Sequence, residues 1–306
     1  MLSVVIPLYN KASTIERAVR SVLNQTVSDF ELIVVNNGSS DGGENIVRSI
    51  DDPRVRLVEQ DNQGVSMARN RGISEARSEW IAFLDADDEW YPTFLETVSG
   101  LHEKYPDCAV CATAYRRCNR RGEIQDIRLY GCPKSNDFKM DNYFEVAALS
   151  DPPFCSISVM VKKEAIQAIG GFPQGIHQGE DLLTWARLAA NNGIAYCRTP
   201  QSIFYTGESS AMDKPKRIPS DVDIVGKTLE QIHQSNPQLA GLKQYIAHWH
   251  KMRASIYLRL SGYAAQCRKE IRISRRWHKN KKTVYYMILS YIPYTLRMKI
   301  MTIFNH

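Results

Sequence analysis

The first hundred residues alternate short apolar runs with stretches whose apolar residues recur every three or four positions. The apolar runs are rich in β-branched residues and predict buried strands at residues 3–7, 30–35, 55–58 and 80–84. The stretches between them predict helices at residues 15–23, 44–50, 65–76 and 92–105. Strands that alternate with helices are joined by right-handed crossovers. The pattern therefore predicts an α/β fold with a Rossmann-like, mainly parallel sheet flanked by helices.

Each predicted strand is followed by a polar loop. These loops cover residues 8–12, 36–43, 61–65 and 85–89. In parallel sheets of this kind, ligands bind beyond the carboxyl ends of the strands. We therefore expect the four loops to meet at one ligand site.

The loop after the fourth strand carries four acids within five residues, namely Asp85, Asp87, Asp88 and Glu89. Clustered carboxylates repel one another, which destabilises a fold unless a cation neutralises them. Carboxylate oxygens suit Mg²⁺ or Mn²⁺, and such ions commonly share their coordination with substrate phosphates. The loop thus indicates a metal site for a diphosphate substrate. The alternative is a solvated acidic turn ahead of the helix that starts near Pro92.

Two arginines are predicted beside this loop. The helix at residues 65–76 follows the flexible Gly64, and helix N-termini bind phosphate through their backbone N–H groups. Arg69 and Arg71 lie in its early turns and could reach a pyrophosphate. The alternative for each arginine is a surface ion pair with Glu75 or Asp61.

The second half of the chain has a weaker pattern. It predicts strands at residues 108–115, 156–161 and 203–205, and helices at residues 164–169 and 181–192. Residues 207–221 contain Ser, Pro and Lys and predict a mobile loop. From about Asp221 onward the pattern is helical.

The net charge of +6 averages two unlike parts of the chain. Residues 241–306 hold 14 Lys and Arg and one acid, Glu270, whereas residues 1–240 hold 25 Lys and Arg against 32 acids. Between Arg268 and Lys282 the cations are densest, with Trp277 among them and an apolar run at residues 285–289 behind them. Cations beside aromatic and aliphatic side chains suit an anionic membrane surface. The alternatives are a solvated helix face and a nucleic-acid site, and we expect no nucleic acid as partner.

Neither a membrane span nor a disulfide framework is predicted. The sequence begins without the basic leader of a signal peptide, and no stretch reaches the roughly 18 apolar residues that a spanning helix needs. The seven cysteines are odd in number. Cys108, Cys111 and Cys118 include the Cys-x2-Cys spacing of a zinc site, but no second pair of His or Cys ligands follows at a suitable distance. We therefore expect these cysteines to be ordinary thiols. The expected location is the cytoplasm, peripheral on the inner face of the cell membrane.

Five stretches, in order along the chain, resemble the motifs of glycosyltransferase family 2. They are residues 4–10, residues 36–41, residues 62–72, residues 84–88, and the pair 170–172 with 179–182. Residues 84–88, Leu-Asp-Ala-Asp-Asp, resemble the family's Asp-x-Asp metal motif. The resemblance covers about residues 2–195, and the chain after about Asp221 lies outside it.

The resemblance implies a GT-A fold and a Mg²⁺ or Mn²⁺ cofactor. It implies an inverting transfer of a hexosyl or N-acetylhexosaminyl group from a nucleotide-diphosphate sugar. The family's donor-binding positions fall on Pro7, Tyr9, Asn10, Asn37, Arg69, Asp85 and Asp87, and its metal ligands on Asp87 and Asp88. Asn37 stands where the family has a base-reading Asp. Its amide oxygen can still accept a hydrogen bond from uracil, so UDP is the expected nucleotide, ahead of deoxythymidine and guanosine.

Asp181 is the expected catalytic base. The acceptor hydroxyl loses a proton as it attacks the anomeric carbon, and a carboxylate within hydrogen-bonding reach can take that proton. The resemblance places this base at Asp181, at the start of a helix, with Glu180 as the adjacent alternative. From its position alone, Asp181 would be a helix N-cap. Arg69 and the metal would stabilise the charge of the leaving diphosphate.

The resemblance also implies an organisation for the whole chain. A GT-A domain is expected at residues 1–220, with a nucleotide half at about 1–105 and an acceptor half at about 106–220. A helical basic region at residues 221–306 follows it. The expected acceptor is a lipid-linked oligosaccharide of surface polysaccharide biosynthesis, such as O-antigen, capsule or exopolysaccharide.

Two other functions stay open on the sequence. A nucleotidyltransferase of similar fold would use the same sheet and acidic loop, but it would normally carry a Gly-rich phosphate loop after the first strand, where this chain has Pro7 to Asn10. The second alternative is a non-catalytic, membrane-bound scaffold.

Overall fold

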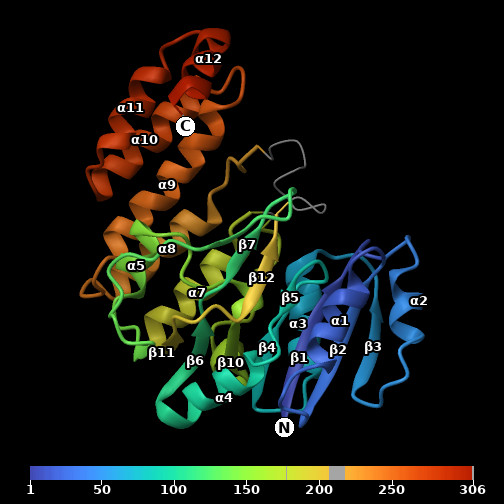
Figure 1. Ribbon diagram of the computed structural model, residues 1–306. Helices are drawn as coiled ribbons and strands as arrows, with labels where there is room; N and C mark the ends of the chain where they lie inside the picture. Colours follow the sequence, from blue (N-terminus) through green and yellow to red (C-terminus); the bar gives the residue numbers. More distant parts are fainter. Residues whose placement is uncertain (177, 207–217, 305–306) are drawn as a thin grey trace. The chain divides into compact units, whose positions relative to one another are not determined.

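The computed structural model describes residues 1–176, 178–206 and 218–304, which form two compact units (Figure 1). One unit holds Met1–Tyr143 and the chain from Ser150 through its last strand, β12 (Ser202–Tyr205). The other holds Phe144–Leu149 and the five helices that follow residue 223. Of the loop predicted at residues 207–221, the part up to residue 217 lies outside the described residues.

The first unit is built on an eight-stranded sheet with the strand order β3-β2-β1-β4-β10-β6-β11-β9. Its strands are β1 (Leu2–Leu8), β2 (Phe30–Asn37), β3 (Val55–Gln60), β4 (Trp80–Phe83), β6 (Cys108–Thr113), β9 (Asp137–Lys139), β10 (Val159–Lys162) and β11 (Gly193–Cys197). β1 pairs in parallel with β2 and β4, and β2 with β3, whereas β10 and β9 run antiparallel to their neighbours. The predicted α/β class with a mainly parallel sheet is therefore confirmed.

Helices cover both faces of this sheet. They are α1 (Ile15–Leu23), α2 (Gly43–Arg48), α3 (Val65–Glu75), α4 (Phe94–Lys104), α6 (Lys163–Ala168) and α7 (Glu180–Asn191). Alternate residues of a strand face opposite sides of the sheet. Val4 and Ile6 of β1 accordingly pack in one core cluster with Ile15 of α1, whereas Val5 faces α3.

The contact between α3 and β1 depends on a glycine. A Cβ atom at Gly72 would lie 2.2 Å from Val5 Cγ1, closer than side-chain atoms approach. The missing side chain lets the backbone of α3 lie directly on β1. This contact fixes the position of Arg69, one turn earlier on the same helix.

A second, four-stranded sheet lies beside the acidic loop. Its order is β5-β12-β7-β8, with β5 (Glu89–Trp90), β7 (Arg116–Cys118) and β8 (Ile124–Asp126) joining β12. β5 follows the acidic loop directly and pairs with β12 in antiparallel fashion. Two segments far apart in the sequence thus meet at this loop. The strand predicted at residues 156–161 is divided into a 3₁₀ turn, η1 (Ser156–Ser158), and β10.

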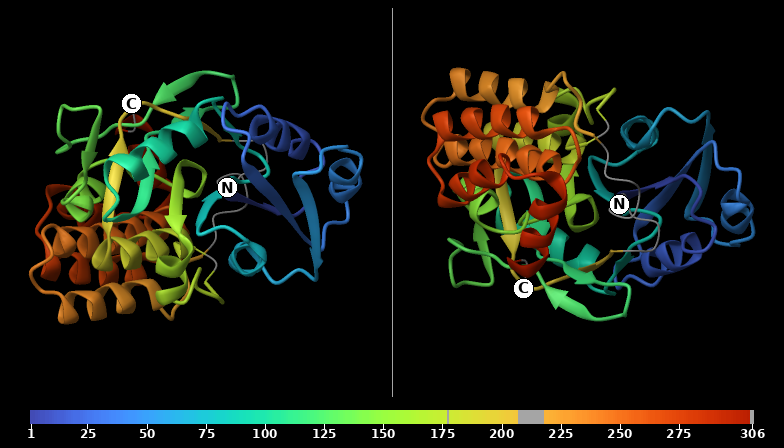
Figure 2. Two further views of the ribbon diagram at one scale, coloured as in Figure 1. Left: turned by 90° about the horizontal axis from the view of Figure 1, so that it is seen from below. Right: turned by 90° about the horizontal axis from the view of Figure 1, so that it is seen from above.

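The second unit is helical. Its helices are α8 (Ile224–Ser235), α9 (Leu242–Leu258), α10 (Ala264–Trp277), α11 (Lys281–Leu289) and α12 (Tyr294–Phe304), joined by most of α5 (Tyr143–Leu149). α9 and α10 pack along each other, and α11 contacts both (Figure 2). Their shared core includes Ala254, Leu258, Ile271 and Leu289. Within the described chain, no helix has the length and apolar character needed to cross a membrane.

Candidate active site

A cavity of about 300 Å³ lies in the first unit. Its charged lining residues are Lys11, Arg69, Asp85, Asp87, Glu180 and Asp181, and residues of η1 and the end of β12 complete the wall. Lys11 follows β1, and Asp85 follows β4. The cavity therefore lies at the carboxyl ends of two parallel strands, which is where sheets of this kind bind ligands.

Arg69 is the buried cation of the cavity. The residue is 4% exposed, and Nη2 donates to Asp85 Oδ1 at 2.6 Å. Burial acts to lower the pKa of Arg69, but the negative charges of Asp85, Glu180 and Asp181 outweigh it and raise the pKa. Its Nε and Nη1 groups have no hydrogen-bond partner among the described residues, so they can donate to an anion.

The two arginines of α3 differ in role. Arg69 pairs with Asp85, so the surface ion pair considered for it from the sequence is wrong. Arg71 does make such a pair, because its Nε donates to Glu75 Oε1 at 3.0 Å. Only Arg69 lines the cavity.

Asp87 is a cavity carboxylate that is already paired with a protein cation. Its Oδ2 accepts from Lys11 Nζ, and its backbone carbonyl accepts from Arg17 Nη2 at 2.6 Å. Burial raises the pKa of Asp87, as does the charge of Asp85, while the hydrogen bond from Lys11 opposes them. The carboxylate is therefore poorly solvated, and more positive charge nearby would stabilise its ionised form.

Asp88 does not line the cavity. Its side chain is 1% exposed, and its Oδ1 accepts from the backbone N–H of Tyr205 at 2.8 Å. Burial, together with Asp85 and Asp87, raises the pKa of Asp88 well above its usual range. This side chain ties the acidic loop to β12. Asp85 and Asp87 thus line the cavity, whereas the Asp88 side chain is buried away from it.

The donor set of the cavity fits a divalent cation. Asp85 and Asp87 present hard oxygen atoms from one loop, and both are lining residues. Their charges lie close enough to raise the pKa of Asp87. A bound Mg²⁺ or Mn²⁺ ion would relieve this repulsion, so the residues present fit the predicted metal.

Glu180 and Asp181 begin α7 on the other side of the cavity. The N-cap is Gly179, whose φ of +83° is left-handed and favours glycine, so an N-cap role for Asp181 is wrong. The Oδ1 atom of Asp181 accepts from the backbone N–H of Leu182 at 2.7 Å. Burial raises the pKa of both acids, and the charge of Arg69 lowers it. A carboxylate with a raised pKa is a stronger base than an exposed one.

The loops after β1 and β2 are joined by polar contacts. Asn10 has a left-handed φ of +49°. Its Oδ1 accepts from the backbone N–H of Ser40 at 2.9 Å, and Asp41 Oδ2 accepts from the backbone N–H of Ala12 at 2.8 Å. These contacts hold the Asn10 backbone in a strained conformation beside the cavity residue Lys11.

Asn37 lies in an amide network at the end of β2. Its Oδ1 accepts from Gln60 Nε2 at 2.7 Å and from the backbone N–H of Gln63 at 3.1 Å, and its Nδ2 donates to Asn62 Oδ1 at 3.0 Å. Both ends of the predicted base-reading amide are thus engaged within the protein. The predicted donor-binding residues Pro7, Tyr9, Asn10 and Asn37 are not among the lining residues of the cavity.

The sequence reasoning missed several residues of this site, among them Lys11, Arg17 and Tyr205. Lys11 lies inside the first polar loop, so the loop itself pointed to it. Arg17 lies on α1 and stacks 3.9 Å from the centre of the Tyr205 ring. Tyr205 gave no local signal, because it lies 117 residues after the acid that it contacts.

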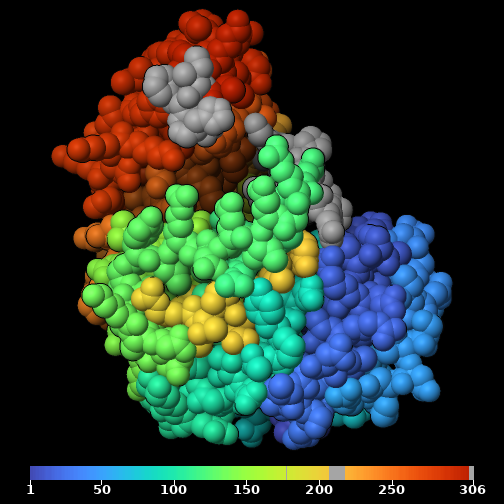
Figure 3. Space-filling view, in the orientation of Figure 1, coloured from blue at the N-terminus to red at the C-terminus, as the bar shows by residue number. Residues whose placement is uncertain are grey.

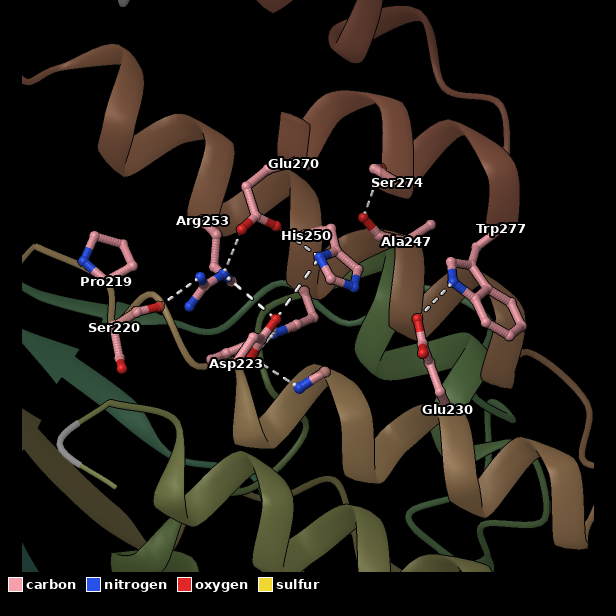
Figure 4. A network of polar contacts seen from close by, with 12 residues as sticks. Pro219, Ser220, Asp223, Glu230, Ala247, His250, Arg253, Glu270, Ser274 and Trp277 are labelled. Atoms are coloured by element: carbon pink, nitrogen blue, oxygen red, sulfur yellow. Dashed lines mark hydrogen bonds and ion pairs between the residues drawn. The ribbon is translucent and has the colours of Figure 1, made fainter. Parts of the chain in front are cut away.

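A second group of acidic and histidine side chains lies in the helical unit (Figure 4). Asp223, His250 and Glu270 bring three potential ligand atoms within 4.8 Å of one another. Arg253 Nε, however, lies 2.9 Å from Glu270 Oε1 and 3.4 Å from Asp223 Oδ2. His250 Nδ1 lies 2.7 Å from Glu270 Oε2. Arg253 thus pairs with both carboxylates, and the cluster forms an ion-pair network.

Comparisons with known proteins point to one family. The sequence profile described as Glycosyl transferase family 2 matches residues 3–170. YibD of Escherichia coli (strain K12), an uncharacterized glycosyltransferase, is 46% identical over 99 residues, which are 32% of this chain and 29% of YibD. TuaG of Bacillus subtilis (strain 168), named for teichuronic acid biosynthesis, is 30% identical over 200 residues, which are 64% of this chain and 75% of TuaG. The chain thus spans less than a third of the length of YibD.

The fold is shared with a solved structure. TarS of S. aureus, residues 1–349 in complex with UDP-GlcNAc, aligns with a TM-score of 0.69 at 16% sequence identity. The alignment covers 98% of this chain and 91% of that one. At this identity the likeness speaks for the fold alone, and it confirms the predicted GT-A architecture.

Proposed function

Because this chain belongs to glycosyltransferase family 2, we propose that it transfers a sugar from a nucleotide-diphosphate donor to a hydroxyl group and inverts the anomeric carbon. One observation carries the proposal. The cavity gathers acids from two distant segments, Asp85 with Asp87 and Glu180 with Asp181, around the buried Arg69. Transfer needs positive charge for the leaving diphosphate and a base for the attacking hydroxyl, and this set of residues supplies candidates for both.

Asp85 and Asp87 are the residues that we assign to the metal. A Mg²⁺ or Mn²⁺ ion held there would supply charge neutralisation for the diphosphate. We leave Asp88 out of this assignment, because it does not line the cavity and its Oδ1 accepts from the backbone of β12. Arg69 would donate its two unpartnered N–H groups to phosphate oxygens.

Asp181 is the base in this proposal. It would accept the proton of the acceptor hydroxyl while that oxygen attacks the anomeric carbon from the face opposite the diphosphate. One displacement of this kind inverts the configuration and needs no second nucleophile. The buried setting of Asp181, which raises its pKa, favours proton uptake.

The donor that we favour is a UDP-sugar of the hexose or N-acetylhexosamine class. Solved structures of TarS, which shares the fold, hold UDP-GlcNAc or UDP. Pro7, Tyr9, Asn10 and Asn37 would contact the nucleoside. Tyr9 is 43% exposed and so has a ring face available for a base. Asn37 Oδ1 would accept from the base in exchange for one of its two present donors, Gln60 Nε2 or the Gln63 N–H, and would add no charge.

The acceptor that we favour is a lipid-linked glycan of surface polysaccharide synthesis. The name of TuaG, which gives it a role in teichuronic acid biosynthesis, supports this class. The basic helical region would keep the enzyme on the anionic inner face of the membrane, where such an acceptor lies.

A panel of nucleotide sugars tests the proposal. The full chain is incubated with each donor and Mg²⁺ or Mn²⁺, with and without acceptor lipid, and the released nucleotide is measured. We expect release of UDP that stops on chelation of the metal. In a second assay the chain is given a nucleoside triphosphate and a sugar 1-phosphate, and release of pyrophosphate there would instead indicate a nucleotidyltransferase. No turnover in either assay would indicate a scaffold.

A further inference from the structure

We propose that the outer face of α11 is the surface through which this protein docks on an anionic lipid bilayer. We define the α11 face as Val284 and Ile288 of α11 together with Tyr291, which lies in the turn after this helix. The inference rests on the proposed function, because a lipid-linked acceptor places the reaction at a membrane. It goes further in naming the side chains that enter the lipid headgroup region.

The α11 face is apolar and exposed. Val284 is 45% exposed, Ile288 60% and Tyr291 68%. Val284 and Ile288 are four residues apart and form a short stripe on one side of α11, and Tyr291 follows in the turn after the helix. Leu296, at the start of α12, is exposed as well. A single exposed apolar residue is ordinary on a protein surface, but a stripe marks a site of contact.

Packing of the helical unit does not require this stripe. The opposite side of α11 buries Tyr286 and Leu289 in the core shared with Ala254 and Ile271. α11 is therefore apolar on the side that holds it in the unit and apolar again on the side that faces solvent. The apolar side that faces solvent has no role in the fold, so we infer that it contacts a partner.

Charge identifies the partner. The exposed basic residues from Gly241 onward are Lys243, Lys269, Arg272, Arg276, Lys279, Lys281, Lys282 and Lys299. The single acid of this stretch, Glu270, is 5% exposed and is enclosed by His250 and Arg253 (Figure 4). From Gly241 to Met301, the described surface thus carries cations without a carboxylate. Two copies that met through this same face would bring like charge together, whereas an anionic bilayer complements both its charge and its apolar stripe.

The end of α11 is held in place for such contact. Arg268 Nη1 donates to the carbonyl of Ser290 at 3.1 Å, and its guanidinium lies 4.7 Å from the centre of the Tyr291 ring. Tyrosine rings favour the boundary between lipid and water, because they combine an apolar body with a polar tip. Figure 3 shows, in orange to red, one face of the helical unit that carries α11.

Vesicle sedimentation tests the proposal with the full chain. We expect the protein to pellet with vesicles of phosphatidylcholine and phosphatidylglycerol and to stay in solution with phosphatidylcholine alone. The variant Ile288→Gln/Tyr291→Gln should bind the anionic vesicles about tenfold more weakly, since it loses the apolar contribution. Lys279→Gln/Lys281→Gln should weaken binding by about tenfold or more, with a smaller dependence on salt.

Leu149→Gln is the matched control. Leu149 is a 66% exposed apolar residue of the same unit but lies outside the α11 face, so its loss should leave vesicle binding unchanged. All substituted side chains are exposed, and thermal unfolding followed by circular dichroism should confirm that every variant folds.

Two results would overturn the proposal. One is anionic-vesicle binding by Ile288→Gln/Tyr291→Gln that equals the original chain. The other is a dimer in solution that this variant converts to a monomer, which would make the α11 face a contact between copies. UDP release without vesicles is measured in parallel. A chain that docks but turns over no donor would remove the proposed function and leave the docking surface in place.

Discussion

At the scale of single residues, burial controls the acids of the cavity. Asp181 and Asp87 both lie in surroundings that disfavour their charge, and each is compensated by one cation, Arg69 for the first and Lys11 for the second. The two carboxylates are thereby suited to different tasks. Asp181 can take up a proton, while Asp87 can exchange its protein cation for a stronger one.

Substitution of Asp181 by Asn should reduce transfer to a small residual rate and leave donor binding intact. Asn keeps the shape of the side chain and can still accept from the Leu182 N–H. Loss of a general base typically costs about 10²–10⁴ in rate. Transfer is measured by product formation and donor binding by calorimetry. Glu180→Gln is the control and should lose far less activity. Turnover of Asp181→Asn at the original rate would remove Asp181 from the role of base.

The pH dependence of the rate gives a second test of Asp181. A base acts when deprotonated, and burial raises the pKa of Asp181 above its ordinary value of 3.8. The value of kcat/KM should therefore rise with pH through this higher pKa and reach a plateau above it. The residual activity of Asp181→Asn should lack this rise. A rate that stays constant down to about pH 4 would contradict the assignment.

Asp87 and Asp88 should respond differently to the same change. Asp87→Asn removes a carboxylate of the cavity and should reduce metal-dependent turnover by about 10² or more. In Asp88→Asn, the amide oxygen can still accept from the Tyr205 N–H, so turnover should stay within about tenfold of the original. Donor turnover over a titration of Mn²⁺ measures both. Equal loss in the two variants would place Asp88 among the metal ligands.

The sequence could indicate some cavity residues and not others. Four acids at the end of a buried strand are unusual enough to mark a site, and Asp85 and Asp87 followed from that. The direction of Asp88 could not be foreseen, because it depends on a hydrogen bond to β12, a strand from the other end of the unit. The engagement of Asn37 with Gln60 likewise arises from the pairing of β2 with β3.

At the scale of elements, the close contact between α3 and β1 can be tested by adding a single methyl group to Gly72. Gly72→Ala would place Cβ 2.2 Å from Val5 Cγ1 and should destabilise the protein by about 1–3 kcal/mol. Gly100→Ala is the control, since Gly100 of α4 has no atom within 4 Å of an added Cβ. That change should stabilise by about 0.5–1 kcal/mol, because alanine favours helix. Denaturant unfolding measures both. Equal effects would mean that α3 does not lie this close to β1.

The ion-pair network should matter for stability and not for chemistry. Glu270→Gln would leave Arg253 buried with weaker compensation and should cost about 3 kcal/mol of unfolding free energy. Ser261, an exposed residue of the turn after α9, offers a control: Ser261→Ala should change little. An unchanged unfolding free energy in Glu270→Gln would show that the network does not stabilise the helical unit.

Acid should weaken this network. Burial acts to raise the pKa of Glu270, but the hydrogen bond from His250 and the charge of Arg253 outweigh it and lower the pKa below its ordinary value of 4.5. A lowered pKa means that the contribution of the carboxylate is complete above about pH 4.5 and is lost as the pH falls below it. The stability difference between the original chain and Glu270→Gln should therefore shrink below pH 4.5. Unfolding curves at several pH values measure it.

At the scale of the whole molecule, the sequence predicted the strands of the first hundred residues better than the later strands. β1 to β4 follow from apolar runs that alternate with helices, a local signal. The strands β5, β7, β8 and β9 are two or three residues long, and long-range pairing defines them, which no short window reveals. The helix α5, most of which belongs to the helical unit, was missed as well.

The position of β10 has a consequence for dissecting the gene. This strand begins at Val159 and lies between β4 and β6 in the sheet. It pairs with the edge of β4 opposite to the edge that pairs with β1. A truncated product that stops near residue 105 would expose the backbone amides of β4 as an unpaired edge, and such edges template aggregation. Separately expressed pieces should accordingly be recovered from inclusion bodies, and co-expression of both should rescue them as a reassembled, non-covalent pair.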